Sequence, residues 1–285
     1  MEEVESESKH VWKLIKDILL LPITLIMALL GKKSFGELFS PIKDVWDFFW
    51  DAKVVAVLIL LNVGAFALFI VDDITGNEIT GISSEEARIE FGLKYLAAGP
   101  KSIKEGNFIP FFASWFMHAG IAHLLGNMLA LFILGRVVEK NFGALKTVSI
   151  YFVSAAIASI ADIAVHFNQM DYFVIGASGA ISGIAAAAIL VQPFYLTYLF
   201  VGIPLPVFII GWLQIIGDVT GVLNPDPKNS IAHISHLGGY LAITAIAFFL
   251  SGEDKSKLKK GLIINLITLA AAALVWWFFF RTPKL

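Results

Sequence analysis

The strongest constraint on this chain is a series of long apolar segments that recurs between about residue 54 and residue 280. A helix needs roughly 20 mostly apolar residues to cross the hydrocarbon core of a bilayer. Irregular backbone is not tolerated against lipid, so segments of this kind are expected to be helices. The sequence therefore predicts an all-α, polytopic membrane bundle with six core spans and a seventh, C-terminal span, over residues 54–71, 117–135, 147–166, 174–192, 203–221, 233–251 and 261–280.

Composition supports this class of protein and excludes others. Of the 285 residues, 58% are hydrophobic and 15% charged, and the mean hydropathy is +0.79. The formal net charge of −2 leaves no basic excess, so we expect a lipid bilayer around the chain and no nucleic-acid partner. Without cysteine, the chain has no thiol nucleophile, Fe–S cluster or cysteine-bound zinc. We expect neither a cofactor nor a bound metal.

Three regions are expected along the chain. Residues 1–50 form a cytosolic or interfacial region, residues 51–251 the six-span core, and residues 252–285 a basic linker with the added span. The first ten residues carry four Glu and lack the basic start of a cleavable signal peptide, so the first membrane segment is expected to remain. Ile18 to Leu30 is apolar for only about 13 residues and contains Pro22, which favours a helix lying on the membrane.

The positions of Lys and Arg predict how the spans are oriented. The compact basic cluster from Lys255 to Lys260 lies between two spans and is expected to be cytosolic. This places the N-terminus in the cytosol of a multi-pass protein of the cell membrane, so that even-numbered spans run from outside to inside. If Ile18 to Leu30 crossed the membrane, every later span would invert.

The connection between the first two spans, about residues 72–116, is long enough to contain structure of its own. Ser83 and Glu86 form a capping-box pattern before an amphipathic stretch over residues 87–98. Aromatic residues then precede the second span, either as an interface belt or as part of a loop embedded in the outer leaflet that shapes substrate access: Phe108, Phe111, Phe112 and Trp115. No internal repeat of 20 to 50 residues is found, which disfavours an inverted-repeat transporter.

Polar side chains within spans are costly and therefore candidate functional groups. Ser178 and His236 are expected about 6 Å and 5 Å below the outer ends of spans four and six, at a common depth. A lone serine among small residues would more often be a helix contact, but a histidine base can activate it as a nucleophile. Gly238 and Gly239 would allow span six to approach span four closely. His233, nearer the span end, is expected to be only hydrated.

Span two carries His123 and Asn127 four residues apart, on one helical face. Their N–H groups are suitable donors for the negative oxygen of a tetrahedral intermediate, together with the Ser178 backbone N–H. His118 either lines the same polar entrance or caps the start of the helix. No Asp or Glu accompanies His236 in the sequence, so packing or water is expected to orient its ring, although Asp218 remains open as a spatial neighbour.

Taken together, these motifs resemble the rhomboid family of intramembrane serine proteases over about residues 50–251. The resemblance rests on the order and spacing of His118, His123, Asn127, Gly135, Glu139, Gly143, Gly176-Ala177-Ser178-Gly179, His236 and Gly239. It implies a serine endopeptidase that cleaves transmembrane segments of single-span or polytopic membrane proteins by a Ser178–His236 dyad at a site open to the outer side. It also implies that Ser178 is the nucleophile, His236 the base, and His123 and Asn127 the oxyanion contacts.

The chain departs from the family pattern at three places. Ile109-Pro110 stands where many members carry Trp-Arg, Ser182 where some place a Tyr that stacks on the base, and Ile243 where a second glycine is frequent. These positions bear on loop anchoring, on holding the imidazole and on packing between spans four and six. None of the three departures removes a catalytic atom.

Three alternatives remain open. Asp162 and Asp218 could form an intramembrane aspartyl protease, although neither lies in a Tyr-Asp or Gly-x-Gly-Asp setting. A metal site could draw on His118, His123, His233 and His236, but no His-Glu-x-x-His motif is present. The third alternative is a non-catalytic, rhomboid-like protein that binds membrane clients, for which a nucleophile and base together would be unnecessary.

Overall fold

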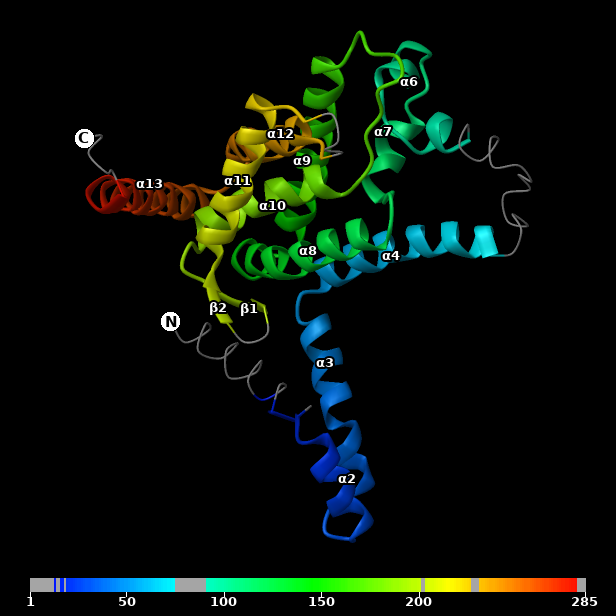
Figure 1. The fold of residues 1–285 in the computed structure, drawn as a ribbon, viewed down its shortest axis with the longest axis vertical. Coiled ribbons are helices and arrows are strands. Elements are labelled where there is room, and N and C mark those ends of the chain that lie inside the picture. The colour runs from blue at the N-terminus through cyan, green and yellow to red at the C-terminus, as the bar shows by residue number, and fades with distance from the viewer. Residues whose placement is uncertain are drawn as a thin grey trace.

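Helix α10 (Ser178–Val191) lies at the centre of a helical bundle (Figure 1). The computed structural model describes residues 13, 16, 17, 19–74, 91–200, 203–226 and 231–280. Small side chains let neighbours approach α10 from several sides, and almost all of its residues are buried. The helices packed around it are α8 (Ile121–Phe142), α9 (Ala144–Val165), α11 (Val207–Leu223), α12 (His233–Ala247) and α13 (Gly252–Phe280).

Length and hydropathy identify three helices that could each cross a membrane, namely α8, α9 and α13. Residues 35–50 and 53–68 meet the same criterion as a pair bent by 99°, while α10 and α11 are shorter apolar helices. The seven predicted segments coincide with α4 (Lys53–Ile74) and α8 to α13. The prediction of a polytopic helical bundle is confirmed.

The N-terminal helices project from the bundle (Figure 1). Helix α2 (Leu21–Leu29) is followed by η1 (Phe35–Phe39) and α3 (Ser40–Trp50), and the chain then turns into α4. With nine residues, α2 is about 14 Å long and too short to cross the roughly 30 Å hydrocarbon core. The placement of this segment on the membrane stays a prediction.

The connection before α8 contains helical structure, as predicted. Residues 91–95 are helical, followed by α6 (Pro100–Lys104), α7 (Ile109–Ala113) and η2 (Ser114–Phe116). Trp115 is buried and donates to Ser159 Oγ on α9 at 2.9 Å, whereas Phe108 and Phe112 are exposed. The aromatic cluster is therefore partly an anchor for this connection. The predicted capping box at Ser83 and Glu86 lies outside the described residues.

A β-hairpin between α10 and α11 was not predicted. Strands β1 (Leu196–Phe200) and β2 (Ile203–Pro206) pair antiparallel, with Leu196 opposite Pro206. The prediction of a span starting at residue 203 is wrong in this detail, because the helix begins at Val207. The apolar run continues from the hairpin into α11, so hydropathy alone could not separate the two.

Candidate active site

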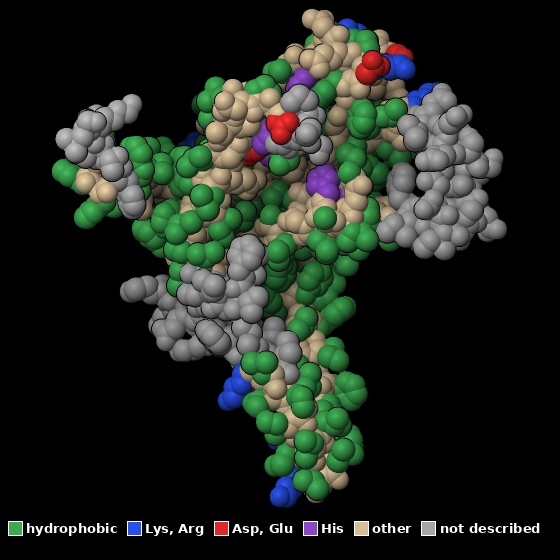
Figure 2. All heavy atoms as spheres, viewed as in Figure 1, with side chains coloured by type: hydrophobic (Ala, Val, Ile, Leu, Met, Phe, Trp, Pro, Cys, Tyr) green, Lys and Arg blue, Asp and Glu red, His purple; other side chains and the backbone are tan. Residues whose placement is uncertain are grey.

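Helices α8, α10 and α12 all begin at one pocket of about 840 Å³. The pocket is lined by four residues that the sequence singled out, His123, Asn127, Ser178 and His236. The expectation that alternate spans bring these polar residues to one end of the bundle agrees with this arrangement. Figure 2 shows histidine and acidic side chains among the hydrophobic side chains of the face viewed.

Ser178 is the first residue of α10, not a residue one turn into the helix as its sequence position suggested. The turn before it contains Gly176 at φ 125°, a backbone conformation that favours glycine. A Cβ at this position would also lie 2.9 Å from Cε1 of the His123 ring. The Gly176 N–H donates to the Ser114 carbonyl at 2.8 Å, which ties the turn to the preceding connection.

Two glycines bring α10 and α12 into close contact. A Cβ at Gly239 would lie 2.1 Å from the Gly179 carbonyl oxygen and 3.0 Å from Ser182 Cβ. The expected close approach of these helices is therefore present, and it places His236 and Ser178 on the same pocket. Among the described residues, no hydrogen bond links these two side chains.

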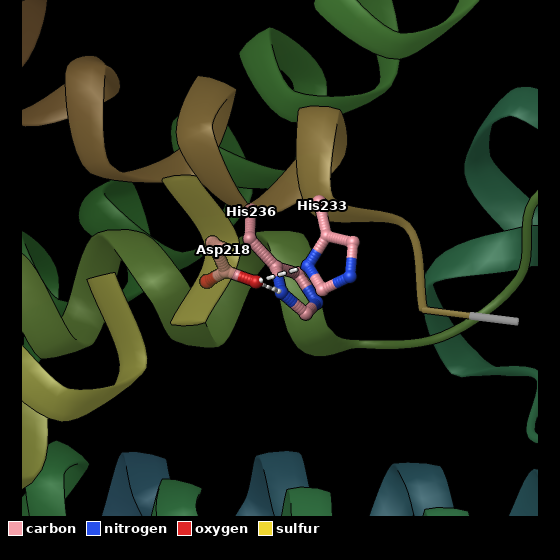
Figure 3. A group of neighbouring side chains, drawn as sticks. All are labelled: Asp218, His233 and His236. Carbon is pink, nitrogen blue, oxygen red and sulfur yellow. Dashed lines mark hydrogen bonds and ion pairs between the residues drawn. The ribbon is translucent and has the colours of Figure 1, made fainter. Parts of the chain in front are cut away.

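Asp218 on α11 is hydrogen-bonded to the His236 ring (Figure 3). The Asp218 Oδ1 atom lies 2.8 Å from His236 Nδ1 and 2.8 Å from His233 Nδ1, and Tyr240 donates its hydroxyl to Oδ2 at 2.6 Å. The expectation that packing or water orients His236 is wrong, and Asp218, which was left open as a spatial neighbour, makes the contact. The expectation that His233 is only hydrated is also wrong, because its ring pairs with Asp218.

The rings of His233 and His236 face different surroundings. His236 lines the pocket with Ser178. His233 lies against Gly221 of α11, where an added Cβ would be 2.2 Å from its Nε2 atom. Of the two histidines, His236 is therefore the one in position to act on Ser178.

His123 and Asn127 present donors to the pocket. His123 Nδ1 accepts a hydrogen bond from the Ala119 N–H at 3.4 Å, so the proton of the neutral ring is on Nε2. The Nε2 and Cε1 atoms are the part of the ring that faces Gly176. Asn127 is buried, and its Nδ2 has no hydrogen-bond partner among the residues that the structure describes. An unsatisfied buried donor on a pocket wall is suited to a ligand that supplies the missing acceptor.

His118 lies beside the pocket but is not part of its lining. Its ring centroid is 5.1 Å from that of His123, and its Nδ1 bonds the Phe116 carbonyl at 3.3 Å. Burial and the neighbouring charge of His123 lower the pKa of His118 to about 4, so it is neutral at physiological pH. It lines a smaller, apolar pocket with Met117, Phe173 and Ile175. Both expectations for His118 are therefore wrong, because it does not line the polar pocket and no described side chain caps the start of α8.

The two buried aspartates have separate partners. Asp162 on α9 accepts from the Tyr172 hydroxyl at 2.7 Å, while Asp218 is held by the two histidines and Tyr240. Burial and the Asp162 charge raise the pKa of Tyr172 above its ordinary value, which keeps the phenol a donor. Among the described residues no hydrogen bond joins the two carboxylates, so a proton-sharing aspartyl pair has no support.

Asp218, His233 and His236 also form the group of described side chains best placed to hold a metal ion. Their three ligand atoms lie within 4.8 Å of one another. The four histidines considered from the sequence do not form such a group within the described residues. The carboxylate and the two imidazoles already satisfy one another without an ion.

Two residues that line the pocket, Gln214 and Tyr172, were not singled out from the sequence. Asp218, which is hydrogen-bonded to His236, was named only as an open neighbour. The only signal for Asp218 was a carboxylate within an apolar span, which is expensive unless it is paired. No sequence signal distinguished Gln214 or Tyr172.

Comparison with known proteins identifies the family to which the chain belongs. The model of the Rhomboid domain matches residues 105–253, just over half of the chain. Two relatives are RHOMBOID-like protein 12, mitochondrial, from Arabidopsis thaliana (26% identical over 214 residues, 70% of this chain) and Rhomboid protease AarA from Providencia stuartii (29% identical over 196 residues, 60% of this chain). The chain belongs to the rhomboid family, and it is a multi-pass membrane protein.

The matched regions cover 58% of the Arabidopsis protein and 66% of the Providencia protein. The chain therefore spans less than two thirds of each relative.

Proposed function

We propose that the protein is an intramembrane serine endopeptidase that cleaves transmembrane segments of other membrane proteins. The observation that carries this proposal is the single pocket where three helices begin, lined by a hydroxyl, an imidazole and two further donors. A relative named as a rhomboid protease supports it. A pocket used only to bind clients would not need a serine and a histidine with the supporting donors of His123 and Asn127.

In this mechanism, Ser178 Oγ attacks the carbonyl carbon of the substrate peptide bond while His236 Nε2 takes the hydroxyl proton. The tetrahedral intermediate carries its negative oxygen toward His123 Nε2–H, Asn127 Nδ2–H and the Ser178 backbone N–H. The C–N bond then breaks, and His236 returns the proton to the leaving amine. Water attacks the acyl-enzyme with His236 again as base, which releases the new carboxyl group and restores Ser178.

The short length of α10 supports hydrolysis below the membrane surface. Its 14 residues span about 21 Å, less than the roughly 30 Å hydrocarbon core. If the far end of α10 reaches one membrane surface, Ser178 lies below the other, and the pocket is then the route by which water reaches it. Substrates are expected to contain Gly, Pro or polar residues that unwind near this surface, because a helical peptide bond is shielded by its own hydrogen bonds.

The charges at the opposite end of the bundle support the proposed orientation. Arg136 and Lys140 end α8, Lys146 begins α9, and Lys255 and Lys257 lie in the first turns of α13. These residues lie at the far end from the starts of α8, α10 and α12. With the basic end in the cytosol, the pocket opens to the outer side of a cell membrane, with residues 51–251 as the catalytic core and 252–285 as an added anchor.

The proposed activity is tested by cleavage of a model single-span protein with purified variants in lipid vesicles. Ser178→Ala and His236→Ala should each lower kcat by at least about 10⁴-fold. Ser154→Ala is the matched control, because Ser154 is a buried serine that packs against Gly183 of α10 away from the pocket. Full activity in Ser178→Ala would refute the proposal, and activity kept in His236→Ala but lost in His233→Ala would move the base.

The proposed orientation has its own test. Single cysteines introduced into the cysteine-free chain can be labelled with a membrane-impermeant thiol reagent in intact cells. A cysteine near Asp171, in the connection before α10, should be labelled from outside, and one at Lys257 only after lysis. The reverse pattern would invert the assigned sidedness.

A further inference from the structure

We propose that Asp218 is a positioning residue for catalysis, so that Ser178, His236 and Asp218 work as a triad assembled from α10, α12 and α11. The inference rests on the proposed function, because an oriented base has a role only if Ser178 is the nucleophile. It adds a third residue that acts through His236 and does not touch the substrate.

The Asp218 carboxylate is held in one orientation by contacts to both of its oxygens. Oδ1 accepts from the Nδ1 atoms of His233 and His236, each at 2.8 Å, and Oδ2 accepts from the Tyr240 hydroxyl at 2.6 Å (Figure 3). The Asp218 side chain is only 5% exposed. A carboxylate this buried and this fully bonded has little freedom to turn away from His236.

The contact fixes which nitrogen of His236 can act as the base. An ionised carboxylate only accepts hydrogen bonds, so the ring proton of His236 must lie on Nδ1. The lone pair is then on Nε2, the nitrogen turned away from Asp218. When Nε2 takes the Ser178 proton, the ring becomes positively charged, and Asp218 stabilises that charge at hydrogen-bond distance.

His233 and Tyr240 have the supporting role of holding Asp218. His233 shares Oδ1 with His236, but its ring packs on Gly221 and does not line the pocket. Both residues lie on α12, as His236 does, so the three contacts join α12 to a single side chain of α11. Ser182 on α10 provides no ring to stack on the imidazole, so Asp218 is the orienting contact that this chain offers.

Other ionisable groups also act on His236. Asp162 on α9 and His123 on α8 interact with it electrostatically, and neither makes a hydrogen bond to it that the described residues show. His233 and Tyr240 lie on its own helix. A charge effect from Asp162 must therefore be separated from orientation by Asp218.

The decisive comparison is between Asp218→Asn and Asp162→Asn. Each substitution removes one buried carboxylate charge near His236 and keeps nearly the same side-chain shape. In the wild type, each of the two carboxylates accepts a hydrogen bond from a tyrosine hydroxyl. Only Asp218 is hydrogen-bonded to the His236 ring. An asparagine there can present its NH₂ group to Nδ1 and stabilise the wrong tautomer.

We expect Asp218→Asn to lower kcat by about 10³- to 10⁴-fold with KM nearly unchanged, and Asp162→Asn to lower it less than about tenfold. Asp218→Glu should recover part of the activity. Equal losses of kcat in Asp218→Asn and Asp162→Asn, or a loss in Asp218→Asn that lies in KM and not in kcat, would overturn the proposal.

A measurement without turnover covers the case in which Asp218→Asn folds poorly. In the Ser178→Ala background, the Nδ1 proton of His236 should give a low-field proton NMR signal that disappears in His236→Ala and is shifted upfield by the milder Tyr240→Phe change. Absence of any such signal would overturn the assignment. If Ser178→Ala retains cleavage, the proposed function fails first. If it is inactive while Asp218→Asn is fully active, only the triad fails.

Discussion

The polar residues at the two ends of the bundle differ in their hydrogen bonding. At the basic end, Arg136 bonds the Phe48 carbonyl and the Asp51 carboxylate, and Lys146 pairs with Asp254. At the pocket end, Asn127 Nδ2 and His118 Nε2 are buried without a hydrogen-bond partner in the described residues. Buried polar groups in native proteins are normally satisfied. Of these two atoms, only Asn127 Nδ2 belongs to a residue that lines the pocket with Ser178 and His236.

Glu139 illustrates the structural role at the basic end. Its two carboxylate oxygens accept from the backbone N–H groups of Val54 and Val55, both at 3.0 Å. These N–H groups belong to the first turn of α4, where a helix has no internal acceptors. Glu139 therefore caps α4 from the side chain of another helix, and its place in the family motif is explained by folding, not by chemistry.

The largest effect that separates the two ends is expected from Asn127→Ala. Removing one oxyanion donor should lower kcat by about 10²- to 10³-fold. The unfolding temperature should stay the same or rise, because the lost Nδ2 group has no partner to leave unsatisfied. Activity assays and thermal unfolding of the same detergent sample check both parts. A fall in stability together with normal kcat would place Asn127 among the structural residues.

Arg136→Met is expected to give the opposite pattern. The Arg136 side chain is 3% exposed, and its guanidinium lies 3.9 Å from the Phe48 ring centroid. Losing these contacts should cost about 2–4 kcal/mol of stability while kcat changes less than a few-fold. Denaturation of the variant in detergent measures the loss. A large drop in kcat at unchanged stability would mean that the basic end is coupled to the pocket.

The smallest effect is expected from Asp51 at low pH. Burial raises the pKa of Asp51, but hydrogen bonds and charge from Lys140 and Arg136 outweigh it and hold the pKa below its ordinary value. The ion pair therefore stabilises the fold above about pH 4, and this contribution is lost as the pH falls through the lowered pKa. Because the carboxylate is half exposed, the contribution is below about 1 kcal/mol.

Thermal unfolding of the wild type and Asp51→Asn at pH 6 and pH 3 measures this contribution. The difference between the two proteins should be small at pH 6 and smaller still at pH 3. A difference that grows toward acid would contradict the assigned direction of the shift.

Hydropathy and motif spacing predicted most of the fold and the main site residues. The alternation of span direction was enough to bring His123, Asn127, Ser178 and His236 to one end, because side chains near the starts of alternate spans share a side. The Asp218 contact could not be predicted in the same way. It depends on how α11 rotates against α12, and a carboxylate inside an apolar run gives no information on which face it occupies.

Hydropathy also could not predict the residue at which a helix begins. Residues 174–177 are as apolar as the helix that follows, so the sequence extended α10 backward and placed Ser178 too deep along it. The positive φ of Gly176 ends that continuity. The same limit applied to the hairpin before α11, where apolar strands and an apolar helix form one uninterrupted hydropathy segment.

The central claim is that Ser178 is a nucleophile activated by His236, and covalent labelling tests it most directly. The detergent-solubilised protein is treated with a fluorophosphonate probe, and the modified residue is identified by mass spectrometry. We predict a single adduct on Ser178, absent in Ser178→Ala and formed far more slowly in His236→Ala, with Ser154→Ala labelled like the wild type. Labelling that persists in Ser178→Ala, or that is as fast in His236→Ala as in the wild type, would contradict the account.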